Sequence, residues 1–262
     1  MPLQVELLWE EVDKKNFDGA LKRLTDQKNL INEIDKDGTC LIMRLFLEPV
    51  TTRPNALIGY LLAQEKLKVD YKDPALNKLV IDPVLTSGNL EFLTILLKNP
   101  VAIKNEHSFA YAEACHYLNQ TTKALTLAQK TPNSPKIAAL TTKLETCRKM
   151  LEMTREATIR LAITKKDSTL LDDLVAAGAN PEACFADGTD PKALAAKIPN
   201  LSAWYKANDD KKLSKMDPKM LALKAMEAQM ATMQMQHLTD KSKVLQQATE
   251  QRTGFLQRVL GF

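Results

Sequence analysis

The side chains best suited to catalysis or metal binding are spread thinly along this 262-residue chain. The three histidines, His107, His116 and His237, do not have the spacing from one another or from cysteine that metal ligands show. Cys115 precedes His116 directly, and neighbouring residues of a helix point about 100° apart. We therefore expect Cys115 in the core and His116 on the surface, without a catalytic or metal-binding role.

Two pairs of adjacent carboxylates, Glu10-Glu11 and Asp172-Asp173, are the remaining candidates for acid–base chemistry. Both lie in amphipathic stretches, where a solvated helix face explains them better than a catalytic role. The sequence contains no glycine-rich phosphate loop, no GxSxG motif and no HExxH motif. It therefore predicts no catalytic residue, no cofactor and no metal ligand.

The composition is that of a folded protein, with 45% hydrophobic and 26% charged residues. Glycine is scarce (8 residues) and aromatic residues make up 5%, which favours helices over sheets. Four widely separated cysteines without a CxxC pair indicate reduced thiols. The net charge of +4 is small, and acidic residues are interleaved with basic ones, so we expect no nucleic-acid partner.

The first residues, MPLQVELLWEEVDKK, lack the basic and apolar regions of a cleavable signal peptide. No stretch approaches the roughly 20 apolar residues that a membrane-spanning helix needs. We therefore expect no membrane span, and a protein that is cytoplasmic or is secreted into a host cell without a Sec signal peptide.

The helices that must position any functional residue are clearest between Arg155 and Ile198. Apolar spacing predicts one helix around residues 159–163 and a second around 170–175. Gly178 follows as a left-handed C-cap, Asp187-Gly188 indicates a turn, and Asp190-Pro191 is typical of the start of a third helix.

Two short helices, a glycine stop and a turn resemble one unit of an ankyrin repeat. The segment INEIDKDGT, from Ile31 to Thr39, resembles the hairpin between ankyrin repeats, with one residue missing before Thr39, whose hydroxyl we expect to cap the next helix. The turn positions Asn16, Arg53, Gly88 and Asn119 recur about every 33 residues, which is the ankyrin period. The next equivalent, Lys166, comes late, after a long helix predicted to start at Ser134-Pro135.

The resemblance implies an all-α fold, an ankyrin-like helical-repeat solenoid with a long C-terminal helix. We expect the array over residues 1–200, with a helical insertion at about 134–153, a polar linker at 201–216 and an amphipathic, methionine-rich helical segment at 217–262. In ankyrin proteins the hairpin tips and the inner helix face bind partners. By the resemblance, the partner-binding residues are Lys36, Asp37, Tyr71, Lys72, Phe185 and Asp187.

The function that follows is a protein–protein interaction scaffold or adaptor with an unidentified protein partner. Two alternatives are an enzyme whose site lies between the insertion and the C-terminal helix, and a structural protein that self-associates through 217–262. Divergent repeats, loops rich in lysine and asparagine, and an apolar C-terminus also resemble effectors that intracellular bacteria inject into host cells. That resemblance implies a transport role for Phe255 to Phe262.

Overall fold

The computed structural model describes residues 4–74, 76–131 and 134–214, and the chain divides into two units, 1–202 and 203–262. The described residues form helices and no β-strand, which confirms the all-α class. The predicted methionine-rich helix at 217–262, its self-association and the transport role of Phe255 to Phe262 all concern residues outside the described part.

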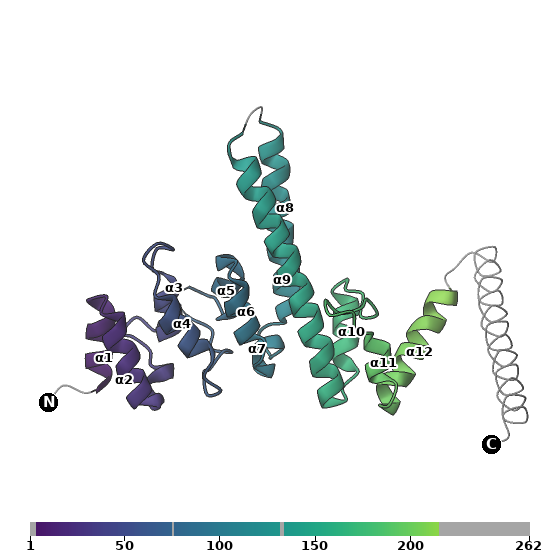
Figure 1. Ribbon diagram of the computed structural model, residues 1–262, viewed down its shortest axis with the longest axis horizontal. Helices are drawn as coiled ribbons and strands as arrows, with labels where there is room; N and C mark the ends of the chain where they lie inside the picture. The colour runs from purple at the N-terminus through teal and green to yellow at the C-terminus, as the bar shows by residue number, and fades with distance from the viewer. Residues whose placement is uncertain (1–3, 75, 132–133, 215–262) are drawn as a thin grey trace, which may run out of the picture. The chain divides into compact units, whose positions relative to one another are not determined.

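The helices are short except for two (Figure 1). In chain order they are α1 (Gln4–Asp13), α2 (Phe17–Asp26), the 3-10 helix η1 (Lys28–Asn32), α3 (Leu41–Phe46), α4 (Asn55–Leu62), α5 (Ile81–Ser87), α6 (Leu90–Leu96), α7 (Pro100–Ile103), α8 (Ala110–Gln129), α9 (Lys136–Lys165), α10 (Thr169–Ala176), α11 (Pro191–Ala195) and α12 (Pro199–Ser214).

Consecutive short helices pair, and the pairs stack into a row within residues 1–202 (Figure 1). Helix α1 packs on α2, α3 on α4 and α5 on α6, while α2, α4, α6 and α9 contact one another in succession. Each contact is made by one apolar stripe, and Leu24, Leu61 and Leu93 on the successive second helices are completely buried. The hydrophobic core therefore runs along the row rather than forming one central cluster.

Three of the predicted turn positions lie between paired helices. Asn16 is the N-cap of α2, where its side-chain oxygen accepts a hydrogen bond from the Gly19 amide at 3.2 Å. Arg53 lies in the turn between α3 and α4, and Gly88 ends α5 with a φ of 68°, a conformation that favours glycine. Pro83 lies in the first turn of α5, where proline is tolerated.

A tight backbone turn precedes α3, α5, α8 and α11. In each turn a backbone amide donates to a carbonyl a few residues later: Asp35 to Thr39, Asp73 to Lys78, Asn105 to Ser108 and Phe185 to Thr189, at 2.9 to 3.0 Å. The expected cap by Thr39 is wrong, because α3 begins at Leu41 and its N-cap, Cys40, makes no side-chain hydrogen bond. Thr39 is instead buried within the turn.

The expected turn at Asn119 is also wrong, because α8 continues through it to Gln129. Neither glycine nor proline interrupts this stretch, and the hydroxyls of Thr121 and Thr122 donate to carbonyls one helical turn earlier. Helix α9 is likewise continuous, so the predicted insertion at 134–153 and the next predicted helix are one element. It ends at Lys166, which has a φ of 54°.

The last helices of the array end and begin at the residues that the sequence indicates. Gly178 has a φ of 85° just after α10, and the Asp190 carboxylate caps α11 by accepting from the Lys192 amide at 2.9 Å. The stretch expected as a polar linker, 201–216, is helical in α12 as far as Ser214. No helix in the described ranges is long and apolar enough to cross a membrane.

Candidate interaction surfaces

The first two turns are built so that some charged side chains remain exposed. The Asp35 carboxylate accepts hydrogen bonds from the amides of Asp37 and Thr39, at 2.9 and 2.8 Å, and so fixes the first turn internally. Lys36 and Asp37 at its tip are exposed, as is Lys72 beside the second turn. We name Lys36, Asp37 and Lys72 the turn-tip surface.

Two contacts tie the first turn to the second. The Tyr71 hydroxyl donates to the carbonyl of Gly38 at 2.7 Å. The Asn32 side chain donates to the Lys66 carbonyl and accepts from the Lys68 amide, both at 2.8 Å. Tyr71 and Asn32 therefore hold neighbouring units together, and Tyr71 supports the turn-tip surface from its side.

Beneath these turns lie two buried ionisable groups, Asp73 and Cys40. One carboxylate oxygen of Asp73 accepts from the Leu76 amide at 2.8 Å, and the other has no hydrogen-bond partner among the described residues. Burial raises the pKa of the Cys40 thiol to about 11, with a smaller contribution from the nearby Asp73 charge. The thiol is therefore protonated at neutral pH and is not a nucleophile.

The last turn places its two predicted contact residues differently. Phe185 is only 3% exposed, and the Arg160 guanidinium lies 4.4 Å from the centre of its ring, so Phe185 belongs to the core. Asp187 is exposed, and it pairs with Arg160 at 3.1 Å. Hydrogen bonds from the Thr189 hydroxyl and amide, with Arg160 nearby, lower the pKa of Asp187.

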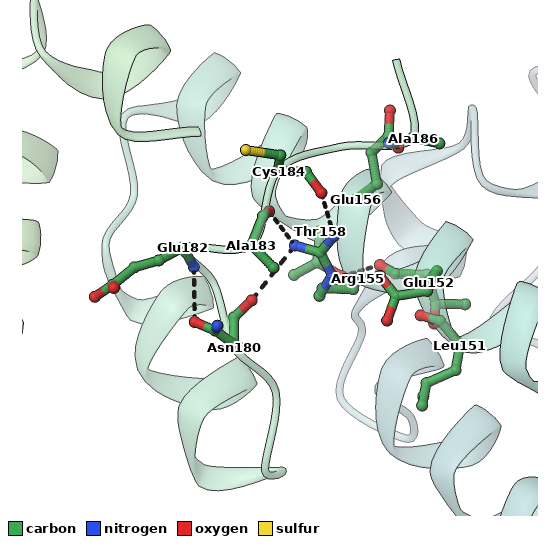
Figure 2. A network of polar contacts seen from close by, with 11 residues as sticks. Leu151, Glu152, Arg155, Glu156, Thr158, Asn180, Glu182, Ala183, Cys184 and Ala186 are labelled. Atoms are coloured by element: carbon green, nitrogen blue, oxygen red, sulfur yellow. Dashed lines mark hydrogen bonds and ion pairs between the residues drawn. The ribbon is translucent and has the colours of Figure 1, made fainter. Parts of the chain in front are cut away.

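A buried arginine on α9 organises the loop that leads to this turn (Figure 2). Arg155 is 4% exposed, and its guanidinium donates to the carbonyls of Asn180, Ala183 and Cys184 at 3.4, 2.8 and 3.1 Å. Its Nε also donates to Glu152 at 2.8 Å. One side chain thus satisfies three loop carbonyls, and it holds the loop against α9.

A hollow of about 480 Å³ lies between α6, α7 and α9. Its apolar lining comprises Leu97, Pro100, Ile103, Met153, Ala157 and Leu161. Lys98 and Arg160 lie at its edge, together with Glu156, which pairs with Arg160. An open, mostly apolar hollow with few polar groups suits an apolar side chain more than a reacting substrate.

The other chemistry-bearing residues are engaged separately. Cys115 is half-buried, which raises the pKa of its thiol, and the neighbouring His116 is exposed and lies 2.7 Å from the Gln120 amide nitrogen. Glu11 pairs with Arg23 at 2.9 Å, and Asp173 pairs with Lys104. No group of three potential metal-binding side chains occurs in the described part of the chain.

Two features escaped the sequence reasoning, Arg155 and the hollow beside α6. The signal for Arg155 was its register, since it shares a helix face with the buried Ile159 and Ala162. The hollow has no such signal, because three separate helices form it. Comparison with protein-family models, with curated proteins and with solved structures yields no match to this chain.

Proposed function

We propose that this chain is a protein–protein interaction scaffold built on a diverged ankyrin-like array. Four similar turns, each placed before a helix, support this proposal together with the stacked helix pairs. The observation that carries it is the pairing of the first two turns. Tyr71 and Asn32 fasten one turn to the next and leave Lys36, Asp37 and Lys72 free to meet a partner.

Rigid turns suit recognition because little conformational entropy is lost when a partner binds to preordered side chains. The amides of Asp37 and Thr39 already bond to Asp35, so the backbone of the first tip does not need to rearrange. Within the last turn, Asp187 adds an exposed carboxylate. Phe185 is left out of the proposed surface because it is buried.

The test is affinity capture from a eukaryotic cell lysate with the full chain, followed by mass spectrometry. The test variant reverses the turn-tip charges, Lys36→Glu, Asp37→Lys and Lys72→Glu. The control makes the same charge changes on and after α2, at three exposed residues: Lys22→Glu, Asp26→Lys and Lys28→Glu.

We expect a partner that the wild type and the control capture and that the turn-tip variant loses at least tenfold. Thermal melts by circular dichroism establish that both variants fold. A partner held equally by the turn-tip variant would refute recognition through these turns. The effector resemblance and the delivery into a host cell stay predictions.

A further inference from the structure

The α8–α9 hairpin extends away from the row of short helices (Figure 1), and its two helices meet along a heptad seam. The seam positions alternate by three and four residues: Ala114, Leu118, Thr121, Leu125 and Ala128 on α8, and Ile137, Leu140, Leu144, Cys147 and Leu151 on α9. Thr121 and Cys147 touch at 3.5 Å, which sets the level at which the antiparallel helices face each other.

The seam is best covered toward the base of the hairpin, although Leu118 and Leu151 are only half-buried there. Ala114, Thr121 and Cys147 are buried there. Nearer the connecting loop, the seam residues are only half-buried: Leu125, Ala128, Ile137, Leu140 and Leu144. Two helices alone leave one side of an apolar seam open, and a third helix closes it in a three-helix bundle.

The part of the hairpin nearer the connecting loop is basic. The stretch from Ala114 to Leu144 contains four lysines and no aspartate or glutamate. All four are exposed, and none forms an ion pair within the described ranges: Lys123, Lys130, Lys136 and Lys143. This stretch therefore carries only positive charge, with Glu113 and Glu145 directly on either side of it, while the row of short helices carries both signs.

The heptad register places two of these lysines beside the seam and the other two on the outer face of α8. Lys136 and Lys143 occupy equivalent flanking positions of α9, and the Lys143 ammonium lies 4.9 Å from the centre of the Tyr117 ring, at the matching position of α8. Lys123 and Lys130 lie on the outer face of α8 at a seven-residue spacing. Leu127 lies between them on the same face and is 65% exposed.

We infer that this side of the hairpin docks an acidic amphipathic helix of a protein partner, which completes a three-helix bundle. The inference rests on the proposed scaffold function and names its partner class. Apolar residues of the incoming helix cover Leu125, Leu140 and Leu144, and its carboxylates pair with Lys136 and Lys143. Lys123 and Lys130 add to the positive field of the hairpin from its outer face. Because the lysines are positively charged, the complementary partner surface is negatively charged. Because the seam residues follow a heptad spacing, the complementary partner segment is a helix.

The same observations favour a protein helix over a phosphate-rich partner. The cations of the stretch are all lysine, whereas arginine provides the bidentate geometry that phosphates and nucleic acids favour. No aromatic residue lies between Leu118 and Leu144 to stack on bases. A lipid surface needs an exposed apolar face, and here most apolar side chains lie in a recessed seam.

The test measures binding of a fluorescent synthetic peptide to the full chain by anisotropy, at about 0.15 M salt. The peptide spans about three heptads, with leucine at the seam positions and glutamate at the flanking ones. A second peptide has the same composition in an order that removes the heptad. We expect the heptad peptide to bind at least tenfold more tightly than the shuffled one.

The hairpin variant, Lys123→Glu, Lys130→Glu, Lys136→Glu and Lys143→Glu, should lose at least tenfold in affinity for the heptad peptide. Its matched control reverses four exposed lysines in the row: Lys22, Lys28, Lys66 and Lys78. A second hairpin variant with four Lys→Gln changes serves if the reversed one does not fold. This neutral variant should weaken binding less than the reversed variant and more than the control.

Three results would overturn the inference. Equal binding of the two peptides would show that the lysines attract any acidic peptide through charge alone, without recognising the heptad pattern. Absence of binding to the heptad peptide would show that the hairpin does not bind an acidic amphipathic helix. Tighter binding of a short RNA duplex, or of vesicles containing phosphatidylserine, would assign the lysines to phosphate. None of these results affects capture through the turn-tip surface, whose separate variant tests the scaffold function, so the two failures are distinguishable.

Discussion

The row of short helices and the α8–α9 hairpin are two ways of building with helices in one chain. In the row, several helices begin or end at a local signal, such as Asn16, Gly88 or Asp190. The hairpin helices have no such interruption, and α9 is 30 residues long. The comparison indicates that residues which begin and end helices, rather than apolar content, determine whether a stretch forms stacked short helices or a long hairpin.

The two regions also differ in how they use charge. In the row, charges form local pairs, including Arg23 with Glu11 and Lys15 with Glu48, each at 2.9 Å. In the hairpin, the lysines have no acidic neighbour in sequence from Ala114 to Leu144. Paired charges help to position the elements of the row, while unpaired charges of one sign give the hairpin a positive field.

The strongest test of the comparison is the side chain at which the two regions join. Arg155→Ala leaves three loop carbonyls without their donor, so we expect a loss of about 3 kcal/mol in the free energy of unfolding. Urea denaturation followed by circular dichroism measures it. The control, Arg148→Ala, removes an exposed arginine of the same helix and should cost less than about 0.5 kcal/mol. Equal effects would show that Arg155 does not hold the loop.

A pH test sharpens the contrast at the first turns. Burial raises the pKa of Cys40 from 9.0 to about 11, so the unfolded chain loses this proton first as the pH rises. The contribution of Cys40 is fully present below pH 9 and is lost between pH 9 and 11, up to about 3 kcal/mol. The difference in unfolding free energy between wild type and Cys40→Ala, measured from pH 8 to 11, should therefore shrink with pH. A constant difference would contradict burial of the thiol.

A pair of substitutions compares a genuine turn with a continuous helix. Gly88→Ala forces a left-handed conformation on alanine and should cost about 1–2 kcal/mol. Asn119→Gly lies inside α8, so the added backbone freedom should cost about 0.5 kcal/mol. Thermal unfolding of both variants measures the two effects. Stabilisation by Asn119→Gly would indicate that α8 turns there after all.

The smallest expected effect concerns the contact between the first two turns. Tyr71→Phe removes the hydroxyl that donates to Gly38, and we expect a loss of about 1 kcal/mol without a change of fold. Denaturant midpoints at a constant slope measure it. Tyr60→Phe, which removes a hydroxyl bond to the Leu24 carbonyl within the row, is the matched comparison. An unchanged midpoint for Tyr71→Phe would show that the hydrogen bond between the two turns does not contribute to the free energy of unfolding.

The sequence was most informative where one residue determines the backbone by itself. Gly88, Gly178 and Asp190-Pro191 were predicted correctly, because left-handed backbone and helix capping are local properties of these residue types. Asn119 was misassigned from the repeat period, since no local feature of the chain ends a helix there. The repeat period of about 33 residues predicts a turn correctly only where a residue that ends or begins a helix occupies the position.

Contacts between distant residues were harder to anticipate. Arg155 acts through carbonyls 25 to 29 residues away, and no local pattern reveals such partners. The turn residues show the same limit: Lys36, Asp37, Lys72 and Asp187 are exposed, while Phe185 is buried and Tyr71 bonds to the preceding turn. The sequence indicated where the chain turns but not which side chains the turn directs inward.

Helix α9 has a mechanical consequence because it belongs to both regions. It runs without a break for about 45 Å, from the end of the hairpin to the loop that Arg155 holds. A continuous helix of this kind is stiff along its axis. A force applied to the hairpin is therefore transmitted along α9 to the loop that Arg155 holds, because the helix has no hinge between the two.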